Sequence, residues 1–201
     1  MINQSVDYTV HDFRMKTKSY EQYTMGTNHF HNSYELYYLM SGTRDYFIND
    51  KTYHIKAGDL VLIKPYVLHK TVDTGERHSR LLISFKPSFL PFKDMDQLLE
   101  SVFSHNNVIR FDTNTRSLVE STFLNMMTDI TNTTPFFESS LQAYVFRLLL
   151  NLNEYIAKQS TTEAKKTDKS TPEYKQDYFF VKTEYRIQRI DFKDILFIEC
   201  R

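Results

Sequence analysis

Three histidines and one glutamate stand at spacings that bring metal-ligating or ligand-binding groups together. His29, His31 and Glu35 lie in the pattern H-x-H-x3-E, and Gly42 follows the glutamate after six residues. On an extended chain alternate side chains point to one side, so these three groups face the same way. A third imidazole, His69, comes from a separate segment. Three imidazoles and a carboxylate suit Mn, Fe, Co, Ni or Zn, and they leave coordination positions open on an octahedral ion.

The favoured alternative for the same four residues is a metal-free pocket, in which they hydrogen-bond to a ligand or to one another. Tyr37 shares the parity of Glu35 and is expected to face this pocket. Arg44 follows the turn at Gly42 and could reach a ligand hydroxyl or carboxylate, or lie as a solvated hairpin charge. His54 and Arg80 are further candidates for the pocket wall. The expected ligand-binding set is therefore His29, His31, Glu35, Tyr37, Arg44 and His69.

Short strands over residues 1–92 must position these side chains. Apolar and aromatic runs at 34–40, 60–63 and 80–85 end at turn residues or at proline, which is typical of strands. The runs at 46–48 and 52–55 flank an Asn-Asp-Lys turn and predict a hairpin. Strands this short and this closely spaced favour an all-β barrel or sandwich.

Residues 93–157 change to a helical period. We expect a short helix near 94–103 and two longer helices over 114–131 and 135–157. The apolar stripe of the last helix is wider than one packing face needs. It is either buried deeply within its own domain or packed against a second subunit. The second alternative predicts a homodimer through Leu141, Val145, Leu148 and Leu152.

The last quarter of the chain differs from the rest. Residues 158–176 contain no Val, Ile, Leu, Met or Phe and predict a flexible linker. Apolar runs at 178–181 and 194–198 predict two strands, with a third at 186–190. These residues are too few to bury a core of their own, so 177–201 is expected to be part of a domain whose remainder is missing.

Composition excludes several classes of protein. The 25 basic and 25 acidic residues balance, so there is no chain-wide basic field for nucleic acid. The single cysteine excludes an intramolecular disulfide and a cysteine-based zinc site. No segment approaches the ~20 apolar residues of a membrane-spanning helix, and the N-terminus lacks a signal-peptide pattern. We therefore expect a cytoplasmic protein with no membrane partner.

Two segments, from His29 to Gly42 and from Gly58 to His69, resemble the two cupin motifs. The resemblance implies a small double-stranded β-helix barrel. In metal-binding cupins the matching positions hold one divalent ion. The resemblance thus implies Mn, Fe, Ni or Zn as a cofactor, with His29, His31, Glu35 and His69 as its ligands.

The longer stretch that begins at HFHNSYELYYLMSGTRDYFIND and ends at SRLLISFKPSFL resembles the N-terminal sensor domain of AraC-type transcription regulators. The resemblance covers roughly residues 5–157. It implies a mainly β fold with α-helices, in which a cupin barrel (1–92) binds a small effector, often a sugar, and an antiparallel helical pair (93–157) dimerises. Residues 177–201 resemble the opening strands of a LytTR-type DNA-binding domain, on the core motif Asp-Ile-Leu-x-Ile-Glu.

We therefore expect a ligand-sensing and dimerisation module of a bacterial transcription regulator, not an enzyme. Its effector is expected to be a small polar molecule that resembles a sugar, because aromatic rings stack on sugar faces. DNA is expected to be bound only through a domain that is incomplete in this chain, so the chain alone should not bind DNA specifically. The alternative is a small metal-dependent cupin enzyme of the dioxygenase or sugar isomerase type.

Overall fold

The structure is a computed structural model that describes residues 5–133, 135–164, 178–182 and 187–195. The chain divides into two compact units, Met1–Thr162 and Glu163–Arg201. The fold is mainly β with three α-helices, and every strand pair is antiparallel.

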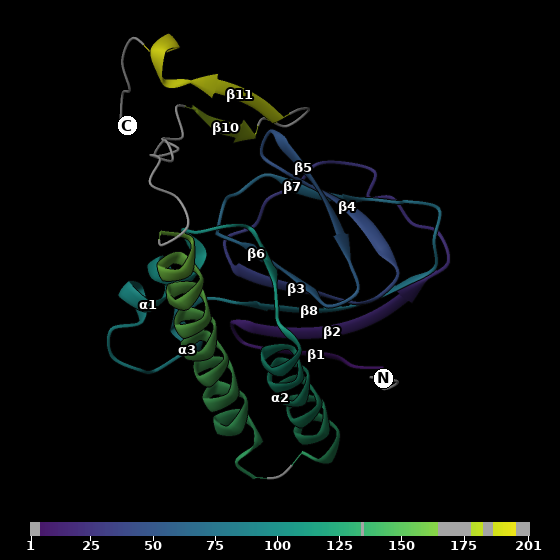
Figure 1. The fold of residues 1–201 in the computed structure, drawn as a ribbon, viewed down its shortest axis with the longest axis vertical. Coiled ribbons are helices and arrows are strands. Elements are labelled where there is room, and N and C mark those ends of the chain that lie inside the picture. Colours follow the sequence, from purple (N-terminus) through teal and green to yellow (C-terminus); the bar gives the residue numbers. More distant parts are fainter. Residues whose placement is uncertain (1–4, 134, 165–177, 183–186, 196–201) are drawn as a thin grey trace. The chain divides into compact units, whose positions relative to one another are not determined.

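The first unit contains two sheets. The larger sheet has six strands in the order β1-β2-β8-β3-β6-β9, and the smaller one has three in the order β5-β4-β7 (Figure 1). The strands are β1 (Asp7–Val10), β2 (Phe13–Tyr20), β3 (Tyr34–Ser41), β4 (Thr43–Ile48), β5 (Lys51–Lys56), β6 (Asp59–Ile63), β7 (His69–Val72), β8 (His78–Phe85) and β9 (Val108–Arg110). The predicted strands at 34–40, 46–48, 52–55, 60–63 and 80–85 all lie within these bounds.

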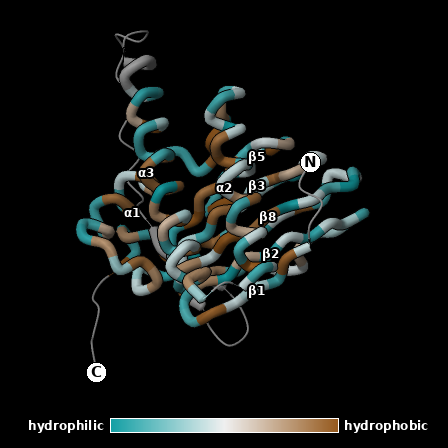
Figure 2. Tube along the Cα trace, turned by 90° about the horizontal axis from the view of Figure 1, so that it is seen from below, coloured by the Kyte–Doolittle hydropathy of each residue, from teal (hydrophilic) through white to brown (hydrophobic). Residues whose placement is uncertain are grey.

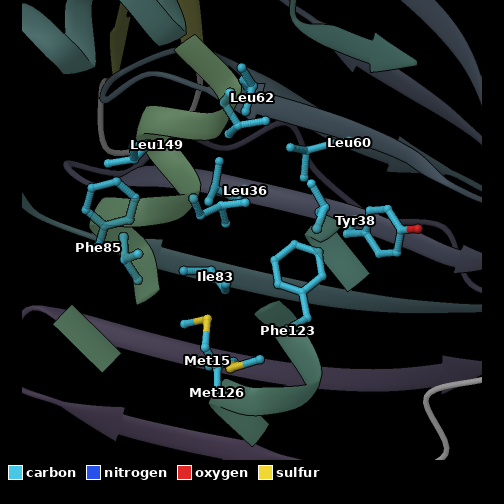
Figure 3. Packing of buried hydrophobic residues seen from close by; sticks show 14 of the residues in the cluster. Met15, Leu36, Tyr38, Leu60, Leu62, Ile83, Phe85, Phe123, Met126 and Leu149 are labelled. Atoms are coloured by element: carbon cyan, nitrogen blue, oxygen red, sulfur yellow. The ribbon is translucent and has the colours of Figure 1, made fainter. Parts of the chain in front are cut away.

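Strand β3 lies in the middle of the larger sheet and is buried on both faces. Leu36 and Tyr38 point into a core shared with the helices, whereas Tyr37 and Leu39 point into a second cluster shared with the smaller sheet. Figure 3 shows Leu36, Tyr38 and their neighbours on β2, β6 and β8 packing against side chains of the helices. The period-two alternation of the strand thus separates a helix face from a face between the two sheets.

The turn that joins β3 to β4 depends on a glycine. Gly42 has φ +80, in the left-handed region that favours glycine. A Cβ atom at this position would lie 2.4 Å from the carbonyl oxygen of Arg77. The chain can therefore pass from the larger sheet to the smaller one at this point only because residue 42 has no side chain.

Three helices cover the helix face of the larger sheet. They are α1 (Met95–Phe103), α2 (Thr113–Asn132) and α3 (Phe137–Ala164), and α2 and α3 lie next to each other (Figure 1). Asp112 caps α2, since its carboxylate accepts a hydrogen bond from the Thr115 backbone N–H at 2.9 Å. Figure 2 shows hydrophobic residues of these helices and of the strands gathered where the two layers meet. No helix in the described ranges is both long enough and apolar enough to cross a membrane.

Helix α3 differs from the prediction at both ends. It begins at Phe137 rather than at residue 135, and it continues to Ala164, seven residues into the segment predicted as a flexible linker. Residues 158–164, KQSTTEA, contain no proline or glycine and include the helix-favouring residues Lys, Gln, Glu and Ala. The lack of Val, Ile, Leu, Met and Phe in residues 158–164 was therefore not enough to predict that this segment is non-helical. The rest of the predicted linker, 165–176, lies outside the described residues.

The wide stripe on α3 is used within the chain. Its members at 141, 145, 148 and 152 are all fully buried in the core that the helices share with the larger sheet. The four residues predicted to contact a second subunit are thus covered by their own chain, because α3 packs on α2 as well as on the sheet. The residues concerned are Leu141, Val145, Leu148 and Leu152.

The second unit contains an antiparallel hairpin of β10 (Tyr178–Lys182) and β11 (Ile187–Asp191). The third strand predicted at 186–190 corresponds to β11. A 3-10 helix over Phe192–Asp194 follows, so residues 194 and 195 are not in a strand as predicted, and the remainder of the predicted strand, 196–198, lies outside the described residues.

Candidate functional site

Three imidazoles converge at one place in the first unit. One donor nitrogen each of His29, His31 and His69 lies within 4.8 Å of the others. Two backbone hydrogen bonds between residues 29 and 69, of 3.1 and 2.9 Å, hold two of these histidines side by side. The prediction that a distant segment delivers the third histidine therefore agrees with the geometry.

Two of the three histidines have a buried ring nitrogen without a partner. The Nδ1 atom of His69 donates to the carbonyl oxygen of Val67 at 2.8 Å, which leaves Nε2 with a free lone pair. The Nδ1 atom of His29 is also buried and has no hydrogen-bond partner among the described residues. Such an arrangement, in which one ring nitrogen is oriented by a carbonyl and the other is free, is common in metal-ligating histidines.

The carboxylate of Glu35 is engaged elsewhere. His31 Nε2 donates to one of its oxygens at 3.1 Å, and the Tyr46 hydroxyl donates to the other at 3.0 Å. Burial alone would raise the pKa of Glu35, but these two bonds, together with electrostatic interactions with His31 and His69, lower it to about 2. Glu35 therefore touches the histidine cluster through His31 and is not one of the three groups that converge.

The protonation states in the cluster differ from one histidine to the next. Burial, together with repulsion from His69, lowers the pKa of His29 to about 4. Burial also lowers the pKa of His69. Burial opposes the charge of His31 as well, yet its contact with Glu35 outweighs this and raises the pKa of His31. His31 Nδ1 lies 3.0 Å from the Ser33 carbonyl oxygen and 3.1 Å from the Ser33 hydroxyl, and Nε2 lies 3.1 Å from Glu35, so each ring nitrogen of His31 has a partner.

These residues fit a divalent metal ion. His29 and His69 offer free lone pairs, and His31 would join them after it loses a proton. The carboxylate oxygen of Glu35 is close enough to be a fourth ligand. A bound ion would supply Lewis acidity toward a ligand carbonyl or hydroxyl. The chain itself orients the imidazoles through Val67 and Ser33.

A cavity of about 80 Å³ lies beside the cluster, between the two sheets. Its wall is formed mainly by polar and aromatic side chains from β2, β3, β4 and β8. The lining residues are Tyr20, Tyr23, Met25, His29, Glu35, Tyr37, Arg44, Tyr46, Thr71, His78, Arg80 and Leu82. Of the predicted ligand-binding residues, His29, Glu35, Tyr37 and Arg44 line this cavity.

Two arginines, Arg44 and Arg80, lie in the wall of the cavity. Arg44 is fully buried, and its one close acceptor is the Asp73 carboxylate, 3.4 Å from Nη1. The Nε and Nη2 atoms of Arg44 and the Nη1 atom of Arg80 are buried without a partner among the described residues. The guanidinium of Arg80 lies over the ring of Tyr37, 5.5 Å from its centre. The alternative that Arg44 is a solvated hairpin charge is therefore wrong.

His54, in contrast, lies away from the cavity. Its side chain is 64% exposed and bonds to Asp45 at 2.8 Å. The neighbouring residue Ile55 is the one that points inward, so the alternation of β5 puts His54 on the outer face.

An open groove of about 460 Å³ continues from the cavity. The two share the residues Tyr20, His29, Glu35, Arg80 and Leu82, and the groove adds His31. The groove is also lined by Arg14, Lys16 and Lys18 on β2, which were not among the predicted site residues. The signal was present in FRMKTKSY, where apolar or small residues alternate with basic ones, because a strand with that pattern has one basic face.

Comparison with known proteins assigns the first unit to a family. A model of the AraC-like ligand binding domain matches residues 10–149, which is more than half of the chain. The match includes both cupin-like segments, the arginines of the cavity wall and most of the helices. No curated protein matches the chain.

Several solved structures resemble part of the chain. A conserved protein of unknown function from Streptococcus pyogenes is 20% identical, with 39% of this chain and 68% of that one covered and a TM-score of 0.37. A cupin 2 conserved barrel domain protein from Leptotrichia buccalis is 18% identical over 43% of each chain, with a TM-score of 0.38. The Mn(II)-containing oxalate decarboxylase of Bacillus subtilis is 18% identical over 38% of this chain and 22% of its own, with a TM-score of 0.35.

Proposed function

The chain belongs to the AraC-like ligand-binding domain family, and on that basis we propose that its first unit is a small-molecule sensor. The observation that carries the proposal is the cavity between the sheets, whose buried ring and guanidinium nitrogens have no partner in the part of the chain that the structure describes. Buried polar groups without partners are costly in a folded protein. A polar ligand that fills the cavity would remove that cost and would thereby favour one conformation of the protein.

The ligand in this proposal is a small polar molecule with a carbohydrate-like skeleton. Tyr20 stacks on Tyr23 with ring centres 4.7 Å apart and on His78 at 5.1 Å, so an aromatic surface borders the cavity. Aromatic faces and hydrogen-bonding walls together suit the apolar and polar sides of a sugar ring. The proposal includes a closed double-stranded β-helix barrel, which the cupin-like motifs support.

The proposal further places this sensor in a homodimeric cytoplasmic regulator that controls an attached DNA-binding domain. Its support is the family of the first unit and the resemblance of residues 177–201 to LytTR-type domains. The dimer contact would have to use exposed side chains of the helices, such as Leu118 and Leu124 on α2, because the apolar stripe of α3 is buried.

One observation favours a second candidate function, a metal-dependent cupin enzyme. The three converging imidazoles provide ligand atoms for an ion that could activate a substrate. Elemental analysis of the purified protein, combined with a turnover assay, distinguishes the sensor from the enzyme. Stoichiometric metal with substrate turnover would support the enzyme and count against a purely regulatory domain.

The sensor proposal is tested by thermal unfolding of the whole chain in the presence of sugars, sugar acids and organic acids. A ligand that binds only the folded state raises the unfolding midpoint by mass action. Mass spectrometry of small molecules released from the freshly purified protein provides a second, independent readout. If no compound is released and none shifts the midpoint, the sensor proposal fails.

A further inference from the structure

The wall of the cavity carries an excess of positive charge. Arg44 and Arg80 are cations, and Glu35 is the one carboxylate among the lining residues. Both oxygens of Glu35 already accept hydrogen bonds, from His31 and Tyr46, so this carboxylate does not serve the arginines.

Several guanidinium N–H groups of Arg44 and Arg80 have no hydrogen-bond acceptor among the described residues. Arg44 has no solvent exposure, and its single ion pair uses one Nη1 contact to Asp73 at the long distance of 3.4 Å. Nε carries one N–H bond and Nη2 carries two, and all three lack an acceptor among the residues that the structure describes. Arg80 Nη1 contributes two more N–H bonds in the same state. A buried guanidinium without acceptors is far more costly than a buried hydroxyl, and a neutral ligand would satisfy hydrogen bonds without neutralising the charge.

The adjoining groove has the same sign of charge. Its lining contains four cations and one carboxylate, and two of the cations, Arg14 and Lys16, are paired with Asp7 on β1. A ligand approaching through the groove would therefore meet a positive potential before it reached the cavity.

We propose that the effector of this sensor is an anionic small molecule, whose carboxylate or phosphate group lies in the cavity between Arg44 and Arg80. The inference rests on the proposed sensing function and narrows its ligand class. The cavity of about 80 Å³ is several times larger than the roughly 10–15 Å³ that one water molecule needs, so it has room for the acid group. The remainder of the molecule lies in the groove beside Lys18, His31 and Ser84. The planar fork of arginine matches both acid groups bidentately.

The test uses the whole, metal-free chain and two matched series of probes. The first series is glucose, gluconate and glucose 6-phosphate, and the second is glycerol, glycerate and glycerol 3-phosphate. Binding is measured by calorimetry at constant ionic strength in a buffer without phosphate. We expect the acids to bind more tightly than the neutral member of each series, and the comparison of the two acids shows whether carboxylate or phosphate is preferred.

Variants connect binding to the two arginines. Arg44→Gln and Arg80→Gln are each expected to weaken binding of the preferred acid by about 10-fold or more, because each removes charge-assisted hydrogen bonds. Arg77→Gln is the control, since residue 77 is exposed and does not line the cavity, yet the change in net charge is the same. Should Arg44→Gln fail to fold, Arg80→Gln at a less buried position still decides the question, and Arg44→Lys tests the fork with the charge retained.

The outcomes separate this inference from the sensing function. Binding of a neutral sugar that is unaffected by Arg44→Gln and Arg80→Gln overturns the anionic ligand and leaves the sensor in place. Equal weakening by all three arginine variants also overturns it, since the effect would then be one of net charge. If no acid in either series binds at millimolar concentration, the anionic ligand is again wrong, and released small molecules decide whether the sensor proposal survives.

Discussion

Tyr46 on β4 donates its hydroxyl hydrogen bond to the carboxylate of Glu35 on β3 at 3.0 Å, and this bond joins the two sheets beside the histidine cluster. Tyr46 is 1% exposed and Glu35 is 5% exposed, so water cannot replace either partner. The hydrogen bond fixes the position of the carboxylate that in turn contacts His31 and raises the pKa of that imidazole.

Replacing Tyr46 by phenylalanine should therefore destabilise the fold. One oxygen of Glu35 would remain buried without a donor, which costs about 1–3 kcal/mol of the free energy of unfolding. Urea denaturation measures this change. Tyr53 lies directly opposite Tyr46 on β5 and is less buried, so Tyr53→Phe serves as the control and should change stability by less than about 0.5 kcal/mol. Equal effects of the two variants would show that the bond to Glu35 has no special weight.

A divalent ion, if the cluster binds one, should depend on His29 and His69. Their free buried nitrogens are the donors, so His29→Ala and His69→Ala should each weaken binding of Zn²⁺ or Mn²⁺ by at least about 10-fold. Affinity should also fall as pH falls, because the ion must displace the proton that Glu35 holds on His31. Calorimetry in buffers of different ionisation enthalpy measures both. His54→Ala is the matched control on the outer face of β5, and a similar loss there would contradict the assignment.

Alkaline conditions should weaken the fold through buried tyrosines. Burial raises the pKa of Tyr37 to about 12 and raises that of Tyr46 well above 10. The folded state therefore keeps protons that the unfolded state loses above about pH 10. This contribution to stability is fully present below about pH 10 and is lost as pH rises toward about 12. Denaturation measured across that range should show the loss, and Tyr37→Phe should make it smaller. An unchanged pH dependence in Tyr37→Phe would contradict the role of that ring.

Replacing Leu148 by alanine should lower the stability of the monomer, whereas replacing Leu118 by alanine should affect only dimerisation. Leu148 is fully buried in the chain's own core, so Leu148→Ala should cost about 2–5 kcal/mol of stability. Leu118 on α2 is 48% exposed, and Leu118→Ala should change the stability of the monomer by less than about 0.5 kcal/mol. If the proposed homodimer forms, light scattering should show Leu118→Ala shifting it toward monomer. A dimer lost in a folded Leu148→Ala variant but kept in Leu118→Ala would contradict this surface.

Local patterns predicted the elements of the first unit well. Strand β3 was expected over 34–40 and spans 34–41, because an aromatic and aliphatic run stops at a glycine turn. The parity argument placed Glu35 and Tyr37 on one face, and both line the cavity. The stripe of α2 from Val119 to Met127 is buried as a helical period requires.

The environment of each side chain could not be predicted in the same way. Burial of Arg44 depends on how β4 packs across from β3 and β8, which no local pattern contains. The same holds for Glu35, whose bonds to His31 and Tyr46 come from tertiary contacts and keep it apart from the converging imidazoles. The wide stripe of α3 left open whether a second subunit or its own chain covers it, and Leu148 is covered by its own chain.

Strand β3 carries side chains of both layers on one backbone. Glu35 and Tyr37 border the cavity, while Tyr38, the residue directly after Tyr37, packs on Phe123 and donates a hydrogen bond to Glu120, both on α2. Adjacent residues of a strand cannot move independently, so a shift or twist of β3 at the cavity is also a shift at α2. A ligand in the cavity would thus be separated from α2 by strand β3 alone. A movement of β3 on ligand binding would therefore reach α2 directly, without passing through other side chains.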